Sequence, residues 1–263
     1  TFDAHYESFI RYYAKKLVPQ SQRKQVRFIG ATATISMYKE HIHNLYHMAG
    51  RRFPCEYPSV KSGEDFYSYT DKKDITRILL GYAPYGRSIT DGMWESVYIM
   101  RLVVYRMIQF FEEGYKEICA NGFDGTLEQY KDMLYDYWIE LVYNNRKQDA
   151  MELENAFQNQ GNNYLEAKGV PRFVIKQMTS DIDFQDVRKT LFDIQANHKN
   201  HESTNLILAT STISHGVDED SFNVMYFFGM PNNNAEYIQA YSRTGRKYTG
   251  IVIDIIRLMR VRD

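Results

Sequence analysis

Two arginines near the carboxyl end of the sequence are the clearest candidates for chemistry. Arg243 and Arg246 flank Gly245 in the segment Tyr-Ile-Gln-Ala-Tyr-Ser-Arg-Thr-Gly-Arg, residues 237–246. A guanidinium group donates hydrogen bonds in a fixed fork that matches phosphate oxygens, so two such groups that converge suit a nucleoside triphosphate. The alternative is that both arginines merely complement the carboxyl terminus of a helix, an effect of about 0.3–1 kcal/mol.

A second candidate segment, residues 209–218, reads Ala-Thr-Ser-Thr-Ile-Ser-His-Gly-Val-Asp. Its small hydroxyl side chains and Gly216 allow backbone N–H groups to approach a phosphate closely. Asp218 offers a carboxylate that can accept hydrogen bonds from ribose hydroxyls. The alternative is an ordinary turn in which Ser and Thr satisfy local backbone groups.

Alternating strand and helix patterns must position these segments. Strand patterns at 137–143, 173–178, 205–209, 224–229 and 250–255 alternate with helical patterns at 147–158, 184–197 and 234–242. This alternation predicts an α/β fold in which helices cover both faces of a parallel sheet. Ligands of such sheets collect at the carboxyl ends of the strands, so we expect the candidate loops to lie there.

The first half of the sequence has a different pattern and is mainly helical. It predicts helices at 3–18, 36–49, 90–120 and 127–134, with strands at 26–30 and 75–82 and a loop at 51–73. Apolar residues recur at three-to-four spacing through 90–120 and mark one buried face. We therefore divide the chain into residues 1–35, a mainly helical insert at 36–135, and an αβα lobe at 136–263.

The composition limits the classes of protein that fit. The chain has 263 residues, with 32 Lys and Arg against 33 Asp and Glu, so any nucleic-acid surface must be local rather than general. Its two cysteines indicate a reducing cytoplasm, and no apolar run is long enough to predict a membrane span. His43 and His47 have the spacing of a metal-binding pair, but no third ligand accompanies them, and we predict an ordinary helix surface and no metal site.

The two candidate segments together resemble motifs V and VI of superfamily 2 helicases, the group that includes the DEAD-box enzymes. Gly216 and Asp218 stand at the characteristic places of motif V, and Gln239, Arg243 and Arg246 at those of motif VI. Residues 30–34, Gly-Ala-Thr-Ala-Thr, resemble motif III at the end of a strand. Weaker likenesses to motif IV and to the phosphate-contacting segment before motif V lie at residues 143–145 and 179–181.

This resemblance implies a RecA-like lobe and a role for each matching residue. The implied arginine fingers are Arg243 and Arg246, and the implied contacts to ATP come from Gly216, Asp218 and Gln239. The implied contacts to the nucleic-acid backbone come from Asn144, Ser180 and Thr210. The remaining implied role belongs to Thr32, Ala33 and Thr34, in the edge of a first RecA-like lobe at residues 1–35. They would couple the ATP state to the grip on nucleic acid.

The motifs that grip ATP in this family are not found in the sequence. No Gly-x-x-x-x-Gly-Lys-Ser/Thr loop and no Asp-Glu-x-His/Asp box occurs. We therefore expect ATP and Mg²⁺ to act in an intact protein whose other RecA-like lobe binds the phosphates and whose Mg²⁺ ligands lie outside this chain. The chain by itself is expected to be inactive.

A narrower resemblance concerns residues 51–54, 64–67 and 80–88, together with the tail from 246 to 263. These segments look like the helicase subunit DrmA of DISARM-type bacterial phage-defence systems. The resemblance favours DNA over RNA as the substrate and implies other defence-system subunits as partners, with no membrane. The alternative is a non-catalytic scaffold that binds nucleic acid and retains a helicase-like lobe.

Overall fold

The structure of the chain, a computed structural model, describes residues 2–22, 27–31, 37–52, 74–179, 181–197, 199–211 and 222–258. The chain divides into two units, Thr1–Asp74 and Ile75–Asp263. Each unit has its own internal contacts, and the candidate site is built on the second.

The first unit contains helix α1 (Phe2–Lys16), a short 3-10 helix (Gln20–Gln22) and helix α2 (Tyr38–Tyr46). Arg11 of α1 donates a hydrogen bond of 2.7 Å to the carbonyl of Tyr46, and the Phe28 ring stacks on the Tyr46 ring with 5.0 Å between centroids. The predicted strand at 26–30 is wrong for its described part, because residues 27–30 have no regular structure. A strand needs a hydrogen-bonded neighbour, and the described part of this unit contains only helices and irregular chain.

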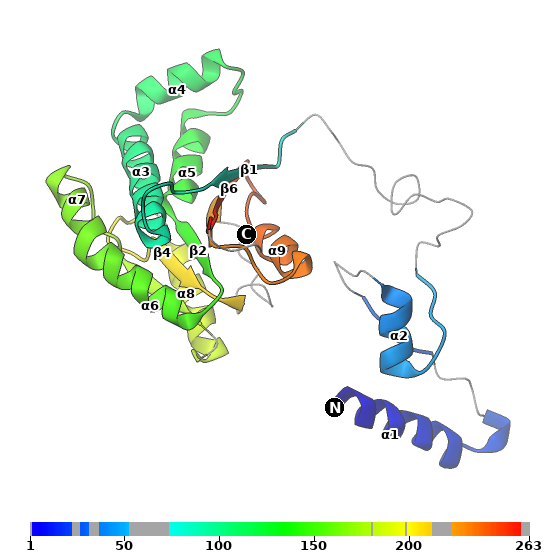
Figure 1. The fold of residues 1–263 in the computed structure, drawn as a ribbon. Coiled ribbons are helices and arrows are strands. Elements are labelled where there is room, and N and C mark those ends of the chain that lie inside the picture. The colour runs from blue at the N-terminus through cyan, green and yellow to red at the C-terminus, as the bar shows by residue number, and fades with distance from the viewer. Residues whose placement is uncertain are drawn as a thin grey trace. The chain divides into compact units, whose positions relative to one another are not determined.

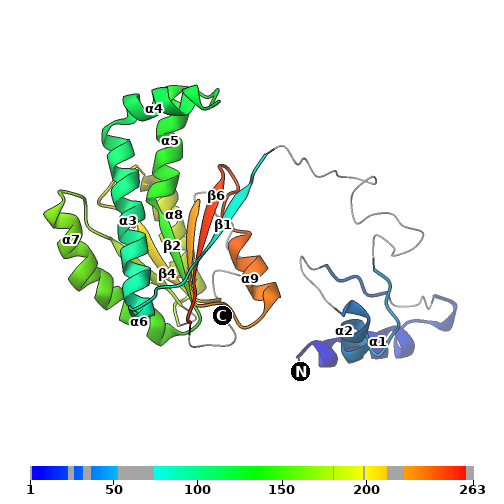
Figure 2. The same cartoon turned by 45° about the horizontal axis from the view of Figure 1, so that its top comes forward.

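The second unit is organised around one parallel sheet of six strands in the order β1-β6-β5-β2-β4-β3. The strands are β1 (Arg77–Tyr82), β2 (Glu140–Asn144), β3 (Ile175–Met178), β4 (Leu206–Ala209), β5 (Val224–Phe228) and β6 (Gly250–Ile255). Strand β1 lies at one edge of this sheet, where Arg77 pairs with Gly250 and Tyr82 with Ile255 (Figure 2). The unit that contains the sheet therefore begins at Ile75, and residues 75–135 contribute a strand and three helices to it.

Helices cover both faces of the sheet (Figure 1). Successive residues of β5 point to opposite faces, so that Val224 and Tyr226 belong to one core and Met225 and Phe227 to the other. The first core also contains α3 (Ile89–Gln109), α6 (Lys147–Ala156), the π-helical turn Phe157–Gly161 and α7 (Asn162–Ala167); the second contains α8 (Phe184–Asn197) and α9 (Asn234–Tyr241). This arrangement confirms the predicted α/β fold with a parallel sheet between two helical layers.

The helix predicted at 90–120 is two helices, α3 and α4 (Phe111–Ala120). Phe110 leaves the helical region at φ −116° and ψ 41°, and this turn sends α4 onto α5 (Leu127–Trp138), where Tyr115 packs 5.9 Å from Tyr130. Polar caps begin the other long helices: Ser88 accepts from the Asp91 N–H, and a reciprocal pair, Thr126 with Gln129, begins α5. Within the described ranges no helix is both long and apolar enough to cross a membrane.

Candidate functional site

The described site residues that lie in loops and at strand ends fall at two opposite ends of the parallel sheet. The carboxyl edge is the end at which the strands finish, and the amino edge is the end at which they begin. Asn144 ends β2 and Thr210 directly follows β4, so both lie at the carboxyl edge, as predicted. The loop that carries Arg243 and Arg246 lies instead at the amino edge, because its Gly245 donates to the carbonyl of Phe222 just before β5. The expectation that all candidate loops share the carboxyl edge is therefore wrong for the arginines. Helix α9 starts at the carboxyl edge and returns along the sheet, which carries the residues after it to the other end of the strands.

At the carboxyl edge, side-chain and backbone hydrogen bonds tie three strand ends together. Asn144 is fully buried, and its Nδ2 donates to the carbonyls of Val142 (3.1 Å) and Ala209 (3.3 Å). The Thr210 N–H donates to the carbonyl of Met178 (3.1 Å), and the Thr210 side chain is also buried. Within the described part of the chain, Asn144 Oδ1 and Thr210 Oγ1 are buried without a hydrogen-bond partner. Leaving a buried polar group unsatisfied costs about 1–3 kcal/mol. An apolar side chain at either position would avoid this cost, so packing alone does not explain why these positions are polar.

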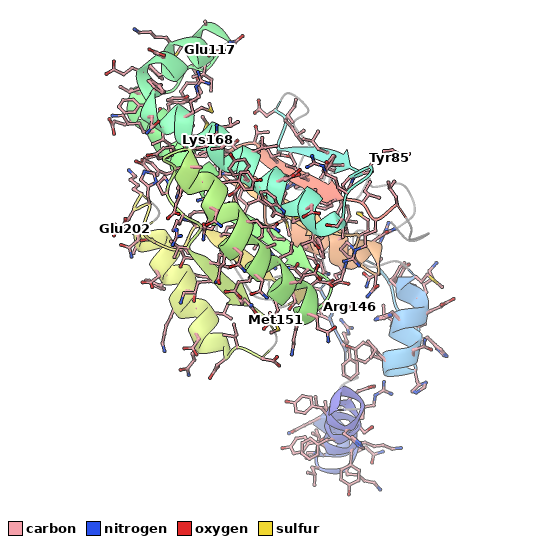
Figure 3. All side chains as sticks on the ribbon, turned by 60° about the vertical axis from the view of Figure 1, so that its left-hand side comes forward. Tyr85, Glu117, Arg146, Met151, Lys168 and Glu202 are labelled. Carbon is pink, nitrogen blue, oxygen red and sulfur yellow. The ribbon has the colours of Figure 1, made fainter. Side chains whose placement is uncertain are left out.

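The loop after β2 adds an exposed cation that sequence reasoning missed. Asn145 Nδ2 donates to the carbonyls of Gly229 and Met230, both at 3.1 Å, which joins this loop to the one after β5. Arg146 follows at the amino end of α6 and is exposed (Figure 3). Its position directly after the motif IV-like residues was the available signal. Unlike Asn144, Arg146 can reach an external phosphate without any rearrangement of the sheet.

At the amino edge, Gly245 fixes the path of the arginine loop. Its φ is +73°, a conformation that favours glycine, and its N–H donates to Phe222 O at 3.0 Å. A Cβ at this position would lie 2.6 Å from both Gly250 N and Thr76 O, closer than any side chain permits. The loop therefore crosses the start of β6 at backbone contact distance, and only glycine fits the crossing.

A third arginine, Arg77 at the start of β1, holds the same loop. Its Nε donates to the carbonyl of Thr244 at 2.5 Å, and its Nη2 donates to the carbonyl of Ser242 at 3.2 Å. These two carbonyls stand immediately before and after Arg243. Sequence reasoning missed Arg77 because the contact spans 167 residues and nothing local to β1 indicates it.

Of the predicted motif VI side chains, Gln239 and Arg243 are half-buried and Arg246 is exposed. Helix α9 is held to the sheet by Tyr237, whose hydroxyl donates to Asp254 Oδ2 at 2.7 Å. Burial raises the pKa of the Asp254 carboxyl, and the Tyr237 hydrogen bond partly offsets this effect. Burial also raises the pKa of the Tyr237 hydroxyl, and Asp254 raises it further. This hydrogen bond anchors α9 to β6.

Six predicted site residues lie outside the described residues. They are Thr32, Ala33, Thr34, Ser180, Gly216 and Asp218. The convergence of Asp218 with the two arginines therefore stays a prediction. The next described residue along the sequence is Phe222, whose carbonyl accepts a hydrogen bond from Gly245 N. Among the described residues, no group of three or more His, Cys, Asp or Glu side chains is arranged to hold a metal ion.

Comparison with known proteins gives a domain family, one curated relative and several similar folds. Residues 135–248 match the family model described as the helicase conserved C-terminal domain. The DISARM protein DrmA of Bacillus paralicheniformis is 25% identical over 251 residues, which are 90% of this chain and 20% of the relative. The chain thus spans about a fifth of the length of the curated relative it matches.

Solved structures with a similar fold include the DUF1998 helicase MrfA bound to DNA and domain 2 of the DEAD-box helicase Mss116p bound to an RNA duplex. The first is 14% identical at a TM-score of 0.46 and covers 71% of this chain and 20% of its own. The second is 14% identical at a TM-score of 0.40 and covers 70% of this chain and 55% of its own.

Proposed function

We propose that this chain, whose residues 135–248 match the helicase conserved C-terminal domain, belongs to a superfamily 2 helicase or translocase that depends on ATP. In that protein it would supply the arginine fingers. Another RecA-like lobe, outside this sequence, would bind the phosphates of ATP. The observation that carries the proposal is the Gly245 crossing, which holds a loop with two arginines at one edge of the sheet.

On the nucleotide side, Arg243 and Arg246 would donate hydrogen bonds to the γ-phosphate as negative charge develops in the transition state. Asp218 and Gly216 would contact the nucleotide, and Gln239 would line the same cleft. Mg²⁺ would be held by carboxylates of the other lobe, because this sequence contains no Asp-Glu-x-His/Asp box. Thr32, Ala33 and Thr34 would couple the ATP state to the grip on nucleic acid.

On the nucleic-acid side, the carboxyl edge would contact the sugar-phosphate backbone through Thr210 and Ser180. The buried Asn144 would act by holding the loops after β2 and β4 in place, and the exposed Arg146 would add a cation. Backbone contacts of this kind give binding that is independent of sequence and weakened by salt. We place DNA ahead of RNA, and a cytoplasmic phage-defence complex as the setting, because of the likeness to the DISARM relative.

The test is ATP hydrolysis by the intact protein with and without nucleic acid. Arg246→Ala should lower turnover by roughly 10³-fold or more while the Kd for ATP changes much less, because an arginine finger acts on transition-state charge. The matched control is Arg172→Ala, which removes an exposed arginine paired with Glu166. Near-normal turnover in Arg246→Ala would defeat the assignment. Salt-dependent DNA binding without any ATPase activity would favour the non-catalytic scaffold.

A further inference from the structure

The geometry points to Arg77 as a positioning residue for the proposed arginine fingers, an inference that rests on the proposed function. Arg77 lies outside residues 135–248, the part of the chain that matches the helicase domain family. Its side chain nevertheless donates two hydrogen bonds to the loop after α9. We assign it the task of holding the Arg243 backbone in the orientation from which both arginines reach the nucleotide.

The contact is a fork around one residue. Arg77 Nε and Nη2 donate to Thr244 O and Ser242 O, the carbonyls on either side of Arg243. Its guanidinium carbon also lies 6.0 Å from the centre of the Tyr241 ring. A planar guanidinium can serve two such carbonyls at once, whereas a lysine ammonium acts as a single point donor on a flexible stem.

The position of these carbonyls explains why a donor is needed. Both come after α9 ends at Tyr241, so no later helical N–H can pair with them. Ser242 is also the C-cap residue, at the negative end of the helix dipole. A cation that binds them from a rigid strand restricts the loop more than water would.

The backbone just before Arg77 is also hydrogen-bonded to the end of the arginine loop. Gly250 N donates to Thr76 O at 2.9 Å, and Thr249 Oγ1 donates to Ile75 O at 2.9 Å. Residues 75–77 and the two ends of the arginine loop therefore form one hydrogen-bonded assembly. The half-buried Arg77 side chain reaches across it to the residue that bears the first proposed finger.

The test is a double-mutant cycle in the intact protein, read by single-turnover hydrolysis of radiolabelled ATP. Arg77→Ala should lower the hydrolysis rate on the order of 10-fold to 100-fold, because small displacements of catalytic groups have effects of this size. Arg77→Lys should fall between wild type and Arg77→Ala. If Arg77 acts through the fingers, Arg77→Ala added to a variant that lacks both of them, Arg243→Ala with Arg246→Ala, should slow hydrolysis no further. A general loss of stability would instead make the two effects multiply.

Hydrogen exchange of the same intact proteins gives a readout that does not depend on activity. In Arg77→Ala, amides of residues 241–249 should exchange faster, while those of β2 and β4 should keep the wild-type rate. Arg172→Ala should change neither set. If Arg77→Ala hydrolyses ATP within twofold of the wild-type rate while Arg246→Ala is strongly impaired, the role of Arg77 is overturned but the proposed function stands. Active Arg246→Ala would overturn the proposed function, and unchanged exchange at 241–249 would then reject the positioning role as well.

Discussion

At the scale of single residues, the site depends on one glycine that is required and one arginine that is exposed. Gly245 has a positive φ and also lies against the backbone of Gly250 and Thr76. Gly86 has almost the same φ, +72°, but a Cβ there would meet nothing within 4 Å. Substitution of Gly86 therefore measures only the free-energy cost of the left-handed backbone conformation. Substitution of Gly245 adds the cost of the steric clash with neighbouring backbone atoms.

We expect Gly86→Ala to lower the free energy of unfolding by about 1 kcal/mol, the penalty of a left-handed conformation for an L-residue. Gly245→Ala should lose about 2–4 kcal/mol, because backbone atoms must also move apart. Urea denaturation of the 263-residue chain, followed by circular dichroism, measures both. Equal losses for the two variants would show that the crossing at Gly245 is looser than the structure indicates.

Arg146 provides the residue-scale test of the carboxyl edge, and Lys168 is its control. Both are exposed cations, and they lie near opposite ends of the α6–α7 segment (Figure 3). If the carboxyl edge binds the nucleic-acid backbone, Arg146→Ala should weaken DNA binding by the intact protein and reduce the salt slope by about one. Lys168→Ala should leave both quantities unchanged. Titrations of labelled DNA at several salt concentrations measure them, and identical behaviour of the two variants would remove this edge from the proposed track.

At the scale of elements, a buried ion pair joins α3 to β2. Arg101 donates from Nε (3.0 Å) and Nη2 (2.7 Å) to Glu140 Oε2, and Nη2 also donates to Asn205 O at 2.8 Å. Tyr226 donates to the other oxygen of Glu140 at 3.2 Å. Burial raises the pKa of Glu140 to about 7, although Arg101 and Tyr226 both act to lower it. The pair therefore ties the insert helix to the centre of the sheet at a considerable desolvation cost.

Arg101→Met should destabilise the chain by about 3–5 kcal/mol, because the remaining carboxyl group is buried without its cation. The double substitution Arg101→Met with Glu140→Met should cost less than this single one, since it leaves no charge behind. Arg87→Ala breaks an exposed pair with Glu95 and should cost about 0–1 kcal/mol. Urea denaturation ranks the three variants. A double variant that is less stable than Arg101→Met would contradict this account, because it would mean that Glu140 stabilises the fold even without its cation.

At the scale of the whole molecule, the sheet unit begins at Ile75, well before residues 135–248 that match the helicase domain model. Strand β1 extends the sheet at one edge, and α3 contributes Met93, Trp94 and Val97 to its first core. A fragment that starts at residue 75 should unfold cooperatively in urea with the midpoint of the full chain's main transition. A fragment that starts at residue 136 should lack cooperative unfolding, because it exposes that core. Cooperative unfolding of the shorter fragment would show that β1 and α3 are accessories to the sheet.

Much of this architecture could be predicted from local pattern. The strand at 250–255 and the helix at 184–197 have the predicted bounds, because short β-branched runs and apolar spacing report directly on strand and helix. Strand order and the place of Arg77 could not be predicted, since they depend on pairings between distant residues. The arginine loop was assigned to the carboxyl edge because the prediction considered only strand β5, which ends there. Helix α9 lies between β5 and the loop and carries the chain back to the amino edge. Motif residues outside the described ranges remain predictions.

The two ends of the sheet hold the proposed nucleotide contacts and the proposed nucleic-acid contacts at a fixed distance from each other. A parallel strand rises about 3.3 Å per residue, so the five residues of β5 keep the edges roughly 16 Å apart. Buried strands bonded on both sides neither stretch nor slide, and β5 and β2 are of this kind. If a bound nucleotide displaces the arginine loop, the central strands would therefore tilt as one rigid body. The resulting movement of the loops at the carboxyl edge would depend on the length of the strands.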